Sequence, residues 1–124
     1  PVGMISGINK ILLQTDEALT KKLKAAAAAA GARAVGGVVA TGDRFVADGA
    51  EKRRIADTFG AVACEMEGGA VAQVCFVNGV PFALLRAISD DASGKAQTDY
   101  PVFADRAARK SAALLLTALE GEIC

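Results

Sequence analysis

Two acidic side chains, Glu65 and Glu67, flank Met66 at a point where an apolar run gives way to Gly68 and Gly69. Side chains two positions apart on a strand point to the same face, whereas a helix that begins between them makes them diverge. A carboxylate in the first turn of a helix also gains about 0.3–1 kcal/mol from the helix dipole, which is a purely structural explanation for Glu67. The spacing therefore allows acid–base or ligand-binding chemistry by one or both carboxylates.

A second group of polar residues, Ser89, Asp90 and Asp91, follows the apolar segment 81–88. An acid at the end of a strand beside apolar surface can act as a proton donor, although capping or turn formation by Asp90 or Asp91 is the simpler alternative. Arg86 lies inside the apolar segment. A charge in such a segment favours an ion-paired or functional role over a solvated edge position.

The composition limits the classes of function. The 124 residues are 52% hydrophobic and 23% charged, with 14 basic and 14 acidic residues, which indicates one globular domain or part of one. The balanced charge argues against nucleic acid or a membrane surface as partner and favours a small molecule. The chain has no histidine, which excludes Ser-His-Asp and Cys-His arrangements within it and leaves acid–base work to Asp and Glu.

The spacing of the cysteines and the length of the apolar runs indicate whether the chain binds a metal and whether it enters a membrane. The three cysteines have no CxxC spacing, so we expect no metal and no cofactor, and free thiols fit a reducing cytoplasm. We expect no signal peptide, and no uncharged apolar run in the sequence reaches the roughly 18 residues that a membrane helix needs.

The hydrophobic pattern alternates between helical and extended segments after a connector at 1–14. It predicts a helix from Thr15 or Asp16 to Gly31, a strand at 33–40, and a helix at 48–59 that Asp48 caps and Gly60 ends. A strand at 61–66, a helix at 67–77, a strand at 81–88 and a helix from Pro101 to Glu120 follow. This order predicts a largely parallel sheet whose ligands bind beyond the carboxyl ends of the strands. All three predicted strands end in polar residues, at 41–43, 65–67 and 89–91.

Three motifs together resemble the 5′-methylthioadenosine/S-adenosylhomocysteine nucleosidases of the nucleoside phosphorylase superfamily. They are TGDRFV at 41–46, VACEMEGGAVA at 62–72 and PFALLRAISD at 81–90. The resemblance covers most of the chain but, by length, only about the C-terminal half of such an enzyme. It implies that residues 1–124 are the C-terminal portion of a single three-layer α/β domain. In that nucleoside phosphorylase-like fold, helices flank a central mixed sheet, and the N-terminal half is absent here.

The resemblance also implies roles around the sugar. Glu67 would hydrogen-bond the ribose hydroxyls, and Met66 would pack on the sugar. Glu65 would be a structural neighbour that positions the backbone. The match departs from the family at Gly68 and Gly69, where an alanine-containing helix start is more usual.

At the base, the resemblance implies that Asp90, next to Ser89, protonates or hydrogen-bonds N7 of adenine. Phe45 would stack on the purine, the backbone of Val46 would read its edge, and Arg86 would help place the attacking water. Breaking an N-glycosidic bond builds positive charge on the sugar and negative charge on the base, and a carboxylate and a proton donor answer these two needs.

The expected activity is hydrolysis of 5′-methylthioadenosine and S-adenosylhomocysteine, releasing adenine in methionine salvage and the methyl cycle. The family implies a cytoplasmic homodimer. Its water-activating glutamate lies in the N-terminal half, so we expect this segment alone to be inactive. A purine nucleoside phosphorylase is the alternative enzyme, and a non-catalytic nucleoside-binding fragment or subunit is the alternative outside enzymes.

Overall fold

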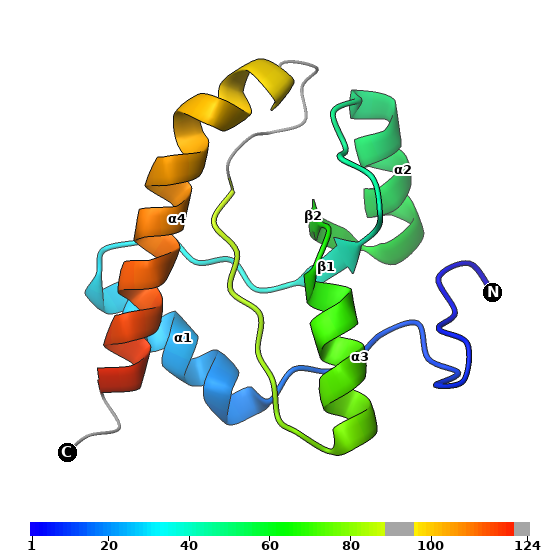
Figure 1. Ribbon diagram of the computed structural model, residues 1–124, viewed down its shortest axis with the longest axis horizontal. Helices are drawn as coiled ribbons and strands as arrows, with labels where there is room; N and C mark the ends of the chain where they lie inside the picture. Colours follow the sequence, from blue (N-terminus) through cyan, green and yellow to red (C-terminus); the bar gives the residue numbers. More distant parts are fainter. Residues whose placement is uncertain (89–95, 121–124) are drawn as a thin grey trace.

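The computed structural model describes residues 1–88 and 96–120, and it confirms the predicted α/β class (Figure 1). The elements in chain order are α1 (Glu17–Ala29), β1 (Val38–Thr41), α2 (Gly49–Phe59), β2 (Ala61–Glu65), α3 (Gly68–Asn78) and α4 (Ala96–Glu120). Strands β1 and β2 pair in parallel, with α2 as the crossover between them. This register places Thr41 opposite Glu65, so the carboxyl ends of both strands meet.

Local capping residues set the start of α1 and both ends of α2 as predicted, whereas α1 ends at Ala29, with Ala30 and not Gly31 as its C-cap. The side chain of Asp16 accepts a hydrogen bond from the Leu19 amide at 2.8 Å, and that of Asp48 accepts one from the Glu51 amide at 2.8 Å. These carboxylates satisfy amides that have no partner within the helix. Gly60 ends α2 in the left-handed conformation with φ of 63°.

Strand β1 is shorter than the predicted strand at 33–40 and occupies only 38–41. Gly36 and Gly37 precede it, and glycine weakens a strand because it has no side chain to pack. A Cβ on Gly37 would lie 2.7 Å from both methyl groups of Val62, so the neighbouring strand lies against this backbone.

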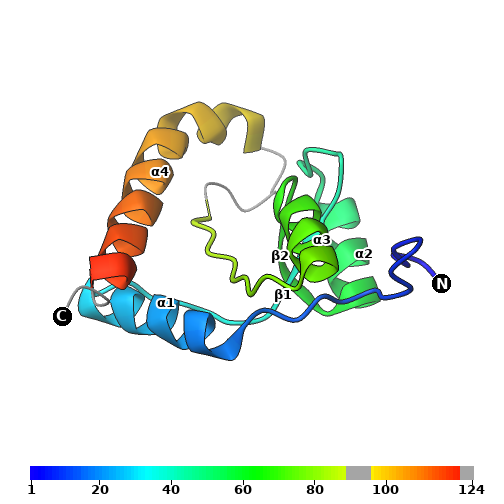
Figure 2. The same ribbon diagram turned by 60° about the horizontal axis from the view of Figure 1, so that its bottom comes forward.

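The prediction of a third strand at 81–88 is wrong: this segment has no strand structure. Side chains of Phe82 to Leu85 are partly buried, but the Phe82 carbonyl accepts its hydrogen bond from the Asp16 amide, at 2.7 Å, at the start of α1. A strand exists only with a partner, and the one sheet among residues 1–88 and 96–120 consists of β1 and β2. Figures 1 and 2 show the segment running between α4 and α3.

Helix α4 begins at Ala96, five residues before the predicted start at Pro101. Both ribbon views show its first turns bending away from the rest of the helix, close to residue 100 (Figures 1 and 2). Proline has no N–H to donate to the carbonyl four residues earlier, which explains a bend inside the helix.

The described core is small and lies mainly where α1 packs on α4. Ala26, Ala27 and Leu114 are buried there, and Ala72 of α3 is also buried. Much apolar surface stays exposed, above all on α3 (Val71, Val74, Val77) and on the last turns of α4 (Leu115, Leu116, Leu119). None of the helices in the described ranges is long and apolar enough to span a membrane.

Replacing Gly60 by alanine tests the cap of α2. A Cβ at φ of 63° is strained, so we expect Gly60→Ala to lower the free energy of unfolding by about 1 kcal/mol, measured by urea unfolding. Gly49→Ala is the matched control at the other end of the same helix. Its Cβ would meet only Arg53 Nη1 at 3.6 Å, so it should be neutral or slightly stabilising. Equal losses in both variants would contradict the left-handed cap.

Candidate active site

Glu65 is the buried centre of the site, at the last position of β2. Its Oε1 accepts a hydrogen bond from the Thr41 hydroxyl. Its Oε2 accepts from the backbone amides of Glu67, at 2.9 Å, and Gly68, at 2.6 Å. The carboxylate thus joins the end of β1 to the start of α3 and satisfies two amides at that helix terminus.

The protonation state of Glu65 follows from these contacts. Burial, the largest influence, raises the pKa of its carboxyl group, but the hydrogen bonds from Thr41 and the two amides, with the charge of Arg86, outweigh it. The pKa is therefore lowered from its ordinary value of 4.5. Every one of these partners donates, so the group is held as an ionised acceptor.

Glu67 is placed differently, since β2 ends at Glu65 and α3 begins at Gly68. Glu67 occupies the N-cap position of α3, yet its side chain makes no capping hydrogen bond. That side chain is 66% exposed, against 2% for Glu65. The two carboxylates therefore diverge. Glu65 accepts hydrogen bonds from the amides at the start of α3, and Glu67 is exposed to solvent.

Arg86 links the two acids. Its Nη1 lies 3.2 Å from Glu67 Oε2 and 3.8 Å from Glu65 Oε2. The guanidinium comes from the extended segment 81–88, so that segment reaches the carboxyl edge of the sheet although it forms no strand. Arg86 is ion-paired, one of the two roles favoured by its place in an apolar segment.

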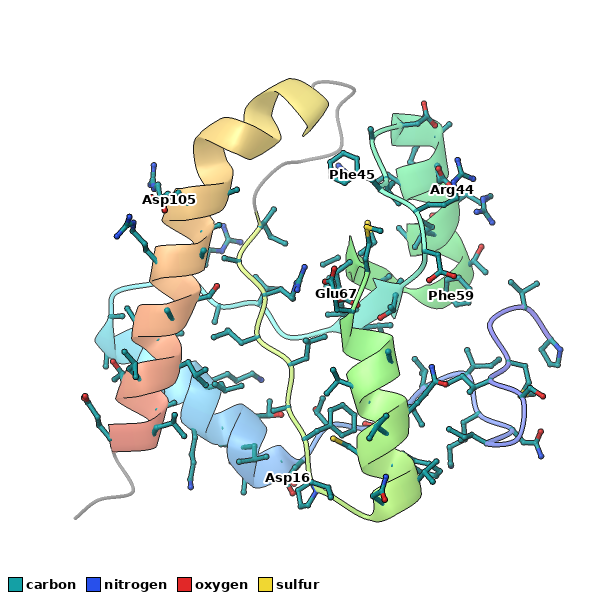
Figure 3. The ribbon with its side chains drawn as sticks, viewed as in Figure 1. Asp16, Arg44, Phe45, Phe59, Glu67 and Asp105 are labelled. Carbon is teal, nitrogen blue, oxygen red and sulfur yellow. The ribbon has the colours of Figure 1, made fainter. Side chains whose placement is uncertain are left out.

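The other predicted site residues lie around this cluster or outside the described part of the chain. Figure 3 shows the Phe45 ring projecting from the loop between β1 and α2 on the same side as Glu67, whereas Arg44 points the other way. Phe45 is 43% exposed, Met66 is 42% exposed, and Val46 is partly buried. Ser89 and Asp90 fall at 89–95, outside the described residues, so the predicted proton donor has no described position.

Thr41 has a role in the site that the sequence interpretation did not assign. Its hydroxyl donates to Glu65 and accepts a hydrogen bond from the Gly69 amide at 2.8 Å. A Cβ on Gly69 would lie 2.8 Å from Thr41 Oγ1, and one on Gly68 would lie 2.9 Å from a Leu84 methyl and 3.0 Å from Glu65 Oε1. The double glycine therefore permits close packing of the helix start. No local signal in the sequence gives this role, because Thr41 and Gly69 are 28 positions apart and the pairing of β1 with β2 sets Thr41 opposite Glu65.

A cavity of about 1310 Å³ lies next to this group of site residues. It is lined by parts of α1, α4, β1 and segment 81–88, and Thr41, Gly69 and Arg86 border it. Glu67, Met66 and Phe45 are not among its lining residues. The volume exceeds the roughly 300–1,000 Å³ of a typical ligand pocket. We interpret it as space between packed layers, distinct from the face that carries Glu67. Among the described residues, no cluster of acidic or cysteine side chains could hold a metal ion.

Comparison with known proteins identifies the family. The family model described as "Phosphorylase superfamily" matches residues 12–120. The chain belongs to this superfamily. The resemblance to 5′-methylthioadenosine/S-adenosylhomocysteine nucleosidases is confirmed as well. Such an enzyme from Treponema pallidum is 50% identical over 71% of this chain and 34% of its own length.

Two further relatives extend the comparison. An aminodeoxyfutalosine nucleosidase of Campylobacter jejuni is 41% identical over 97% of this chain and 52% of its own length. The structure of a Helicobacter pylori 5′-methylthioadenosine/S-adenosylhomocysteine nucleosidase mutant, with 5′-methylthioadenosine in its active site, matches with a TM-score of 0.92 and 35% identity. It covers 98% of this chain and 52% of that one. The chain thus spans about half the length of these relatives or less.

The lowered pKa of Glu65 predicts how stability depends on pH. The ionised carboxylate contributes stability above pH 4.5, and this contribution is lost as the pH falls through the lowered value. Urea unfolding between pH 6 and pH 3 should therefore show a steeper loss for the unmodified chain than for Glu65→Gln.

The matched control for this pH series is Asp105→Asn. It removes an exposed carboxylate, paired with Arg109 at 2.8 Å on the surface of α4, and such pairs contribute little to stability. Its stability should fall with pH as steeply as that of the unmodified chain. If Glu65→Gln behaved in the same way, the buried carboxylate would not carry the pH dependence.

Proposed function

We propose that residues 1–124 are the C-terminal portion of a nucleosidase that hydrolyses the N-glycosidic bond of 5′-methylthioadenosine and S-adenosylhomocysteine, releasing adenine. The observation that carries this proposal is that the Glu67 carboxylate is exposed and makes no capping hydrogen bond. Glu65 caps α3 in its place, and Arg86 holds Glu67 from one side. The named activities of the relatives support hydrolysis.

The proposed chemistry assigns Glu67 to the ribose. A carboxylate that accepts hydrogen bonds from the sugar hydroxyls stabilises positive charge as the glycosidic bond breaks. Met66 packs against the sugar, and its exposure beside Glu67 leaves it accessible for that contact. Arg86, at 3.2 Å from Glu67, places the attacking water on this side.

At the base, Asp90 with Ser89 supplies a proton or a hydrogen bond to N7 of the departing adenine. Phe45 stacks on the purine, and the Val46 backbone reads its edge. The projection of Phe45 on the same side as Glu67 supports this assignment (Figure 3).

We further propose that activity requires the N-terminal half of the enzyme and that the complete enzyme is a homodimer. The exposed apolar faces of α3 and α4 and the large cavity beside β1 support this view, because such surface is normally covered by packing. Relatives about twice as long as this chain support it too. Cys64 and Cys75 are not joined in a disulfide bond, which fits the proposed cytoplasmic location, where the enzyme would serve methionine salvage.

Aminodeoxyfutalosine is the second candidate substrate. It is supported by the Campylobacter jejuni relative, whose match extends over almost the whole of this chain. Both candidates use the same Glu67 cluster, so the distinction is one of substrate preference.

Adenine release tests the proposal and the need for the N-terminal half. We define the fusion enzyme as this chain placed after the N-terminal half of the Campylobacter jejuni nucleosidase. We expect the fusion enzyme to release adenine from 5′-methylthioadenosine and S-adenosylhomocysteine without added phosphate, and residues 1–124 alone to release none. Turnover by residues 1–124 alone would refute the N-terminal requirement. Cleavage only with phosphate would indicate a phosphorylase, and binding without turnover a non-catalytic subunit.

Amide substitutions separate the roles of the acids. In the fusion enzyme, we expect Glu67→Gln and Asp90→Asn each to lower kcat/KM by about 10²-fold or more, because each removes a group that meets charge developing in the transition state. Glu65→Gln should cost far less, since an amide oxygen can still accept from the helix amides. Equal losses for all three variants, measured by adenine release, would instead indicate that Glu65 and Glu67 act as an acid–base pair.

A further inference from the structure

We propose that Thr41 is the positioning residue that holds Glu67 in place for the sugar, acting through Glu65 and the start of α3. The inference rests on the proposed role of Glu67. Among the described residues, the Thr41 hydroxyl makes hydrogen bonds to Glu65 and to the Gly69 amide, and the proposed chemistry gives it no contact with the sugar or the base.

The direction of each hydrogen bond follows from the partners. The Gly69 N–H can only donate, so the Thr41 oxygen must accept there, and its own proton then points to Glu65 Oε1. The Thr41 hydroxyl is therefore a donor and an acceptor at the same time. No apolar side chain of the same size can replace it.

The hydroxyl sits where three elements meet. Thr41 ends β1 and is the register partner of Glu65, which ends β2, and Gly69 lies in the first turn of α3. Thr41 thereby orients one oxygen of Glu65, and the other oxygen holds the amides of Glu67 and Gly68. With its backbone held, Glu67 reaches the sugar or Arg86 only by side-chain rotation.

The glycine at 69 is the second observation. An alanine Cβ there would lie 2.8 Å from both Cβ and Oγ1 of Thr41, a separation that forces one of the two to move. The chain thus has a poor helix former at the position where the hydroxyl approaches the backbone. The hydrogen bond between the Gly69 amide and the Thr41 hydroxyl thus depends on the absence of a side chain at position 69.

A double-mutant cycle in the fusion enzyme tests the proposal. We expect Thr41→Val to lower kcat/KM for 5′-methylthioadenosine roughly 10- to 100-fold, since small displacements of a catalytic group are costly, and Thr41→Ser to stay within about threefold of the parent. In the Glu67→Gln background, Thr41→Val should add almost nothing, because it acts through Glu67. Thr58→Val, which removes an exposed hydroxyl bonded to the Arg54 carbonyl, is the matched control and should leave kcat/KM unchanged.

Each other outcome has a defined meaning. An equal fold loss from Thr41→Val with and without Glu67→Gln would overturn the proposal and leave Thr41 a merely structural residue. If Glu67→Gln itself had no effect, the proposed function would fail. The link from Thr41 to α3 would then be judged by amide hydrogen exchange, which should be faster at Gly69 in Thr41→Val than in Thr41→Ser. Unchanged exchange would refute it.

A second route does not depend on the folding of Thr41→Val. Gly69→Ala displaces the Thr41 hydroxyl by the contact at 2.8 Å and keeps every hydrogen-bonding group. We expect it to lower kcat/KM at least tenfold in the parent and little in the Glu67→Gln background. A Gly69→Ala enzyme with parental kcat/KM would contradict the proposal.

Discussion

The buried carboxylate of Glu65 is the interaction on which the rest of the site depends. It accepts from Thr41 and from two amides at the start of α3, and the guanidinium of Arg86 lies beside it. Without it, the amides of Glu67 and Gly68 would lose their acceptor, and the Thr41 hydroxyl would lose the group to which it donates. One ionised side chain therefore joins β1, β2, α3 and the segment 81–88.

This arrangement gives two acids of the same type opposite surroundings. A carboxylate that holds a fold must be buried and fully hydrogen-bonded, whereas one that binds a ligand must be exposed and free to exchange partners. Glu65 meets the first condition with 2% exposure, and Glu67 meets the second with 66%. The helix start between them creates the difference, because it turns the second side chain away from the face of the strand.

The parts of the fold that the sequence predicted are those decided locally. Asp48 and Gly60 bound α2 through contacts within a few residues, and such signals can be read from a single sequence. The strand predicted at 81–88 failed because an apolar run becomes a strand only with a distant partner. The motifs predicted the family, and the role that they give Glu67 stays a prediction. The role of Thr41 could not be predicted, because it depends on the register that sets it opposite Glu65.

The groups of the site also differ in the elements that hold them. Thr41, Glu65 and Glu67 are held by the β1–β2 ladder and the start of α3. Arg86 belongs to a segment outside that ladder, tied to α1 by the bond between the Asp16 amide and the Phe82 carbonyl and bordering the large cavity. The carboxylates are thus held by contacts within the ladder and α3, whereas Arg86 reaches them from a segment that a hydrogen bond ties to α1.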